Sequence, residues 1–125
     1  MSRRATLEKT FTQADFDAFA ALSGDDNPIH VDPDFSARTR FGRTVAHGAL
    51  LCSVLRGLVE ELVPSGRQIR QATMYPAPSP AGEALRFQAE TTSETAGRIT
   101  LALTVTRLAD GEVTCRGETE VAPCR

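Results

Sequence analysis

The clearest hydrophobic pattern in the chain lies between residues 48 and 62, where leucines recur at helical spacing. From Leu51 through Leu55 and Leu58 to Leu62 the steps are four, three and four residues. Further apolar positions widen the stripe, so the pattern predicts a long helix. Because so much of its circumference is apolar, we expect this helix to be buried. Pro64 and Gly66 are expected to end it. The apolar positions are Leu50, Leu51, Val54, Leu55, Leu58, Val59 and Leu62.

The second half of the chain alternates apolar and polar residues, which is typical of strands. Asp110-Gly111 predicts a hairpin turn and Ala96-Gly97 a second one. We therefore expect an α+β fold in a single domain, 1–125, with an antiparallel meander wrapped around the long helix. The alternating ranges are 68–75, 85–91, 99–105 and 113–121, with a proline-rich turn after the first.

Before the long helix, the pattern predicts one strand over 6–11 and two short helices, at about 12–22 and 33–40. Thr12 has the side chain of a helix N-cap. Gly24 permits the left-handed turn that closes the first of these helices.

A polar segment, residues 23–30, separates the two short helices, and we expect it to be a loop. Pro28 lacks a backbone N–H and pushes Asn27 out of the helical region. Asp25 and His30 are then free to converge on one small target, such as a water molecule. We expect any chemistry to lie here.

The composition excludes several classes of protein. With 41% hydrophobic and 24% charged residues the chain is typical of a soluble globular protein, and its net charge of −2 argues against a nucleic-acid binder. It has no apolar run of the roughly 18 residues that a membrane span needs, and no signal-peptide pattern. Cys52, Cys115 and Cys124 show no metal or redox spacing, so we expect reduced thiols in the cytoplasm, with Cys52 in the core.

We expect no metal and no other cofactor. The acidic residues around Asp25 do not form a calcium loop, because His30 stands where glycine is required and Ser36 where a glutamate is expected. His30 and His47 have no cysteines nearby, so they do not make a zinc site.

The segment Phe19-Ala-Ala-Leu-Ser-Gly-Asp25-Asp-Asn27-Pro28-Ile29-His30, followed by His47-Gly48 at the start of the long helix, resembles the signature of MaoC-like, (R)-specific enoyl-CoA hydratases. The likeness continues through Tyr75-Pro76-Ala-Pro78 and Gly82-Glu83. It implies a hot-dog fold, in which a sheet wraps around a central helix, and pairing of two copies into a homodimer.

The resemblance also implies roles for individual residues. Asp25 and His30 would hold and activate a water molecule, and the backbone N–H of Gly48 would polarise a thioester carbonyl. The reaction would be the reversible hydration of a trans-2-enoyl thioester to the (R)-3-hydroxyacyl thioester. Which of Asp25 and His30 acts as base stays open, because their titrations would be coupled.

Further residues are expected near the substrate. Asn27 would help to hold the loop, and His47 would either contact the substrate or brace the connector before the helix. Arg56 stands where such hydratases commonly carry a serine, so it would alter acyl specificity or belong to a dimer contact. A basic cluster after the loop would meet the phosphates of CoA or an acidic carrier protein, or else is solvated surface; it comprises Arg38, Arg40 and Arg43.

Three other functions stay open at this point. A hot-dog thioesterase would cleave acyl-CoA, although the Asn-Pro-x-His element argues against it. A dehydratase could act on polyketide-like chains bound to a carrier protein. A non-catalytic subunit could pair with a partner that supplies the active pair; the intact Asp25 and His30 disfavour this, whereas Arg56 keeps it open. The patterns leave the acyl chain length undetermined.

Overall fold

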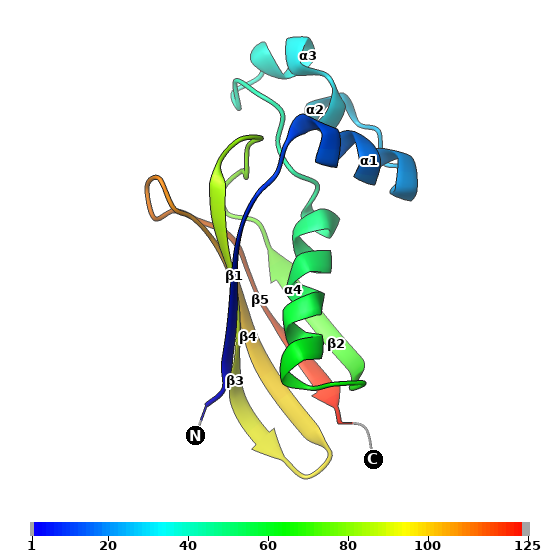
Figure 1. The fold of residues 1–125 in the computed structure, drawn as a ribbon, viewed down its shortest axis with the longest axis vertical. Coiled ribbons are helices and arrows are strands. Elements are labelled where there is room, and N and C mark those ends of the chain that lie inside the picture. Colours follow the sequence, from blue (N-terminus) through cyan, green and yellow to red (C-terminus); the bar gives the residue numbers. More distant parts are fainter. Residues whose placement is uncertain (1, 124–125) are drawn as a thin grey trace.

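The protein is an antiparallel sheet curved around one long helix (Figure 1). This computed structural model describes residues 2–123. The expected hot-dog arrangement is confirmed. The elements in chain order are β1 (Arg4–Thr10), α1 (Gln13–Ser23), α2 (Pro28–Val31), α3 (Pro33–Ala37), α4 (Gly48–Leu62), β2 (Arg67–Met74), β3 (Ala84–Thr95), β4 (Arg98–Arg107) and β5 (Val113–Ala122).

The strand order is β1-β3-β4-β5-β2, and every neighbouring pair is antiparallel. Strands β3, β4 and β5 form the expected meander. β2, however, does not lie beside β3: it pairs with β5 at the far edge of the sheet. The proline-rich link that follows β2 is too long for a tight hairpin, so it carries the chain across to β3 instead.

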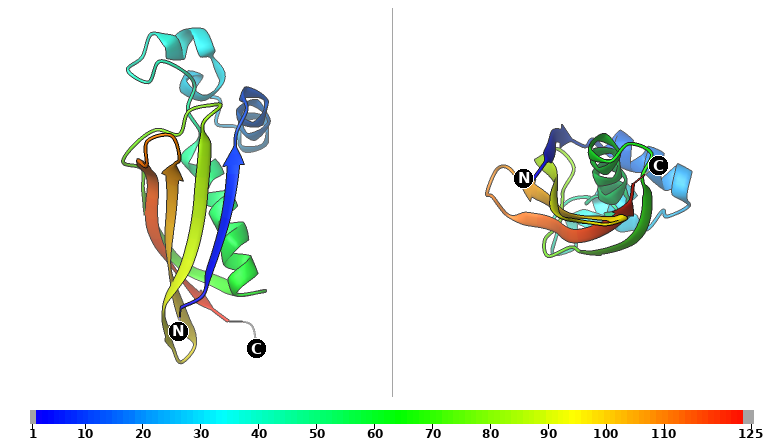
Figure 2. Two further views of the ribbon diagram at one scale, coloured as in Figure 1. Left: turned by 60° about the vertical axis from the view of Figure 1, so that its left-hand side comes forward. Right: turned by 90° about the horizontal axis from the view of Figure 1, so that it is seen from below.

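Helix α4 lies on the concave face of the sheet, which curls around it when the molecule is viewed from below (Figure 2). Only one side of the helix is buried, and Ala49, Ser53 and Gly57 on the other side are exposed. The apolar stripe therefore predicted the helix correctly but overstated its burial in a single chain. The buried side, Leu51, Leu55, Leu58 and Val59, packs against Leu85, Phe87, Leu101, Leu103 and Val105.

The three short helices gather at one end of the sheet, above the N-terminus of α4 (Figure 1). Thr12 caps α1 as expected, and Gly24 closes it with a φ of 84°. The segment after Gly24 is not wholly a loop, since Pro28 begins α2. Proline is tolerated at the first helical position, where no backbone donor is needed, so it starts a turn here instead of breaking one.

The described cysteines, Cys52 and Cys115, are free thiols. Cys115 is buried in the core, and burial raises the pKa of its thiol to about 12. The prediction that Cys52 lies in the core is wrong. Cys52 is half-buried, and its Sγ lies 3.1 Å from Tyr75 Oη. Cys124 lies outside the described residues. Among residues 2–123, none of the helices is long and apolar enough to cross a bilayer.

Two glycines provide a matched test of the packing. A Cβ at Gly117 on β5 would fall against the carbonyl oxygen of Ala72 and the side chain of Thr73 on β2, whereas one at Gly57 on α4 would meet open space. We expect Gly117→Ala to lower the free energy of unfolding by about 1–3 kcal/mol. Gly57→Ala should raise it by about 0.5–1 kcal/mol, because alanine favours the helix. Urea unfolding measures the free energy of unfolding of both variants. A Gly117→Ala variant as stable as the wild type would contradict the close packing of β5 on β2.

Candidate active site

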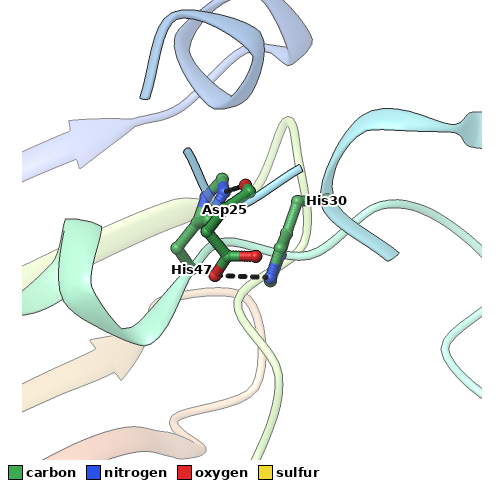
Figure 3. A group of neighbouring side chains, drawn as sticks. All are labelled: Asp25, His30 and His47. Atoms are coloured by element: carbon green, nitrogen blue, oxygen red, sulfur yellow. Dashed lines mark hydrogen bonds and ion pairs between the residues drawn. The ribbon is translucent and has the colours of Figure 1, made fainter. Parts of the chain in front are cut away.

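The side chains of Asp25, His30 and His47 meet beside the N-terminus of α4 (Figure 3). Asp25 Oδ2 lies 3.9 Å from His30 Nε2. This separation is longer than a direct hydrogen bond, but one water molecule can bond to both groups across it. The carboxylate is about half exposed, with 55% of the side chain accessible, whereas only 10% of the His30 side chain is.

The orientation of His30 is fixed by a backbone carbonyl. Its Nδ1 lies 2.8 Å from the oxygen of Val45, which can only accept, so Nδ1 carries the proton. In the neutral ring, Nε2 is then an acceptor facing Asp25. The same segments are joined again by Val45 N–H, which donates to Ile29 O at 3.1 Å, and Gln13 Nε2 donates to His30 O at 2.9 Å. These contacts fix the His30 ring with Nε2 toward Asp25.

His47 braces the loop that carries Asp25. Its ring is 1% exposed, and Nε2 donates to the backbone carbonyl of Asp25 at 2.9 Å. The ring stacks on His30 with centroids 3.8 Å apart and meets the edge of Phe19 at 4.9 Å. Of its two expected roles, bracing is therefore the one that the contacts show.

Asn27 holds the loop in a different way. Its Oδ1 accepts from the N–H of Ile29 at 3.1 Å and thereby caps α2. Ser36, which is fully buried, donates its hydroxyl to Ile29 O at 3.2 Å. Side-chain hydrogen bonds thus hold both the N–H and the carbonyl of Ile29, the residue before His30.

Gly48 is the first residue of α4, and its N-cap residue, His47, makes no side-chain capping bond. Backbone N–H groups in the first turn of a helix lack intrahelical partners and favour negative charge. A Cβ at Gly48 would collide with the ring of Tyr75, 2.6 Å from Cζ and 2.9 Å from Oη. Burial raises the Tyr75 pKa to about 12, so its hydroxyl stays neutral. Sequence reasoning missed this contact, because nothing local to Tyr75 indicates it.

A cavity of about 850 Å³ opens beside His30 and Gly48. His30 is the member of the histidine–aspartate cluster that lines it. Apolar residues such as Val45 and Leu51 form part of its wall, and Tyr75 lies next to Gly48. Three arginines, Arg40, Arg43 and Arg107, also line it. The cavity therefore combines an imidazole, the start of a helix and a group of cationic side chains.

Arg56 lies elsewhere. Its Nη2 donates to Gly66 O at 3.2 Å and lies 3.7 Å from Glu60 Oε1, near the C-terminal end of α4. It is not among the residues that line the cavity, and the structure does not bring it to Asp25 and His30. The predicted contact of Arg56 with substrate is thus not supported by its position in the single chain.

Comparison with known proteins gives consistent matches. Residues 1–113 match the sequence model of the family described as "MaoC like domain". The (R)-specific enoyl-CoA hydratase of Aeromonas caviae is 38% identical over 95 residues, which is 74% of this chain and 71% of that protein. The 3-hydroxybutyryl-CoA dehydratase of Methylorubrum extorquens is 31% identical over 86 residues, covering 67% of this chain and 55% of the relative. The solved (R)-hydratase from A. caviae superposes with a TM-score of 0.92 at 31% identity, covering 98% of this chain and 96% of that one.

Proposed function

Because the chain belongs to the MaoC-like family, we propose that it is a hydro-lyase that reversibly adds water to a trans-2-enoyl thioester and forms the (R)-3-hydroxyacyl thioester. The observation that carries this proposal is that Asp25 lies 3.9 Å from His30, and that His30 lines the same cavity as Gly48 at the start of α4. The hydratases and dehydratases named among its relatives support the reaction class.

The geometry of Asp25 and His30, which we call the dyad, suits activation of water. A water molecule between Asp25 Oδ2 and His30 Nε2 can donate one hydrogen to each and direct its lone pairs away from both. Its oxygen attacks C3, and the electron pair of the C2=C3 bond moves toward the thioester carbonyl. The proton taken from water is then returned to C2, so that hydroxyl and hydrogen add across the double bond. The dyad acts as one coupled unit in these transfers.

The enolate-like oxygen needs a donor, and Gly48 at the start of α4 supplies one. An N–H at a helix N-terminus stabilises negative charge, and removing one such donor typically costs about 2.7–4 kcal/mol in the barrier. Without a side chain, Gly48 lets a carbonyl approach closely. Its N–H thus complements His30 in the same cavity.

The competing functions are less favoured. A thioesterase would direct the same water at the thioester carbonyl, but the relatives are named as hydratases and dehydratases. A non-catalytic subunit has no need of a His30 ring fixed in one tautomer beside a carboxylate. The choice between CoA and a carrier protein concerns the far end of the substrate and not the chemistry. We also propose a cytoplasmic location, which is supported by the free thiols of Cys52 and Cys115, since a reducing compartment keeps thiols reduced.

We further propose that the reaction uses no metal ion. Asp25, His30 and His47 have potential ligand atoms within 4.8 Å of one another. However, the two imidazole rings are stacked, with only 21° between their planes. Lone pairs lie in the ring plane, so stacked rings direct them along separate planes and not at a shared ion. One nitrogen of each ring also faces a backbone carbonyl.

We also propose that two copies form a homodimer through the edge strand β2. In the sheet order β2 is terminal, so one side of its backbone has no neighbouring strand, and it carries the exposed side chains of Ile69 and Met74. An open apolar edge favours pairing with another strand. Tyr75, which lies next to Gly48, directly follows β2, so this edge strand leads into the site.

The dyad is tested by replacing each member. Asp25→Asn and His30→Gln should each lower kcat for crotonyl-CoA hydration by about 10²–10⁴-fold, the usual contribution of a positioned acid or base. The exposed neighbour Asp26 is a matched control, and Asp26→Asn should stay within about twofold of the wild type. Loss of the conjugated-thioester absorbance measures turnover, and circular dichroism checks folding. Near-normal activity in either dyad variant would refute these roles, and an inactive wild type would refute the function.

A methyl group at Gly48 tests the donor half of the site. Gly48→Ala should lower kcat/KM by at least about tenfold, because its Cβ occupies the position of the Tyr75 ring and obstructs the approach of a carbonyl. Gly57→Ala on the exposed side of the same helix should not change kcat/KM. A fully active Gly48→Ala enzyme is the result that would remove Gly48 from the mechanism.

The dimer is tested by its mass in solution. Sedimentation should give twice the 13.5 kDa of one chain. Ile69→Glu on β2 should shift the protein toward the monomer and reduce activity, whereas Leu7→Glu on the opposite edge strand, β1, should not change the mass. An active wild type that sediments as a single chain would exclude the dimer as a requirement.

A further inference from the structure

The arginines that line the cavity differ in how their charges are balanced. Arg43 Nη2 lies 2.9 Å from Glu83 Oε1, and Arg107 Nη2 lies 2.8 Å from Asp110 Oδ2. The pairing with Arg107 lowers the pKa of the Asp110 carboxyl. Within residues 2–123, Arg40 has no carboxylate partner. The uncompensated positive charge among these arginines is therefore that of Arg40.

Arg40 is positioned by its neighbour. Its guanidinium lies over the ring of Phe41, with Cζ 5.1 Å from the ring centroid. The turn that carries both is tied down, because Thr39 Oγ1 donates to the carbonyl of the buried Ser36 at 2.7 Å and accepts from Phe41 N–H at 3.2 Å. A guanidinium resting on an aromatic face keeps its edge donors free. Arg40 is thus an exposed donor group on an ordered turn.

The basic cluster seen in the sequence is consequently divided by the fold. Arg38 ends α3 and does not line the cavity, and Arg43 is neutralised by Glu83. Arg40 alone of these three combines a place on the cavity with an unbalanced charge. Because the chain as a whole carries a net charge of −2, a local positive charge on the cavity wall favours an anionic ligand there.

We propose that Arg40, held over Phe41, binds a phosphate group of the thiol carrier that delivers the acyl chain. This inference rests on the proposed function and adds a carrier-recognition site to it. The acyl end of such a substrate reaches His30 and Gly48, whereas the phosphates lie at the opposite end of the pantetheine arm. Arginine suits that end, because its planar fork forms paired hydrogen bonds with phosphate oxygens.

The test separates carrier recognition from chemistry. Arg40→Ala should raise KM for crotonyl-CoA about fivefold to tenfold, the loss expected for one charged hydrogen bond at an exposed site, with kcat within about twofold. KM for crotonyl-pantetheine, which lacks phosphate, should not change. Arg38→Ala is the matched control from the same segment and should change neither value. Added salt screens the charge, so it should reduce the difference in KM for crotonyl-CoA between the wild type and Arg40→Ala.

Two more substrates identify the phosphate. If the effect of Arg40→Ala disappears with crotonyl-3′-dephospho-CoA, the 3′-phosphate of CoA is the ligand. If Arg40→Ala still raises KM for crotonyl-3′-dephospho-CoA and also for a crotonyl carrier protein, the ligand is the phosphate next to the pantetheine arm. CoA and the carrier protein share that phosphate. Either result supports the site. An unchanged KM for crotonyl-CoA, or an equal rise for crotonyl-pantetheine, would overturn it.

A binding measurement keeps this proposal distinct from the function. Calorimetry with CoA itself needs no turnover, and Arg40→Ala should weaken CoA binding by the same fivefold to tenfold factor. Arg40-dependent binding by a protein that hydrates no enoyl thioester would refute the proposed function and leave the phosphate site standing. If the enzyme hydrates enoyl thioesters but Arg40→Ala binds CoA as tightly as the wild type, the phosphate site is refuted and the proposed function stands.

Discussion

The hydrogen bond between His30 Nδ1 and the carbonyl of Val45 is the contact on which the site depends. It fixes the tautomer of the imidazole, and it also ties the helix that carries His30 to the segment that leads into α4. Val45 N–H donates back to Ile29 O, and Val45 forms an isolated bridge with Pro80. Since Gly48 follows three residues later, the His30 imidazole and the N-terminus of α4 are held in a fixed relation by a short stretch of backbone.

His47 adds a second tie of the same kind, because its Nε2 donates to the carbonyl of Asp25. Asp25 and His30 are therefore both positioned by contacts to the residues immediately before α4. Helix α4 is itself fixed on the sheet, because fully buried residues such as Leu55 and Val59 pack into the core. A packed helix and sheet thus support a candidate site whose residues come from a short helix, a loop and the first residue of α4.

Much of this could be predicted from the sequence, because periodicity and capping are local signals. The leucine stripe gave α4, alternation gave β3 to β5, and Thr12 and Gly24 marked the ends of α1. The edge position of β2 could not be predicted, since alternation shows which side chains share a face and not which strands pair. Pro28 predicts an irregular segment, but it begins α2, because proline fits the first position of a helix.

The contacts that sequence reasoning missed have no signature in residue identity. The Val45 carbonyl is a backbone group, and the contact of Tyr75 with Gly48 joins residues far apart in the chain. The central claim, that the dyad and Gly48 act on one thioester, is tested most directly by a crystal structure of the Asp25→Asn variant with a bound enoyl thioester. We expect the carbonyl oxygen within hydrogen-bonding distance, about 2.7–3.1 Å, of Gly48 N, and C3 facing the space between residue 25 and His30. A thioester bound with its carbonyl away from Gly48 would contradict the account.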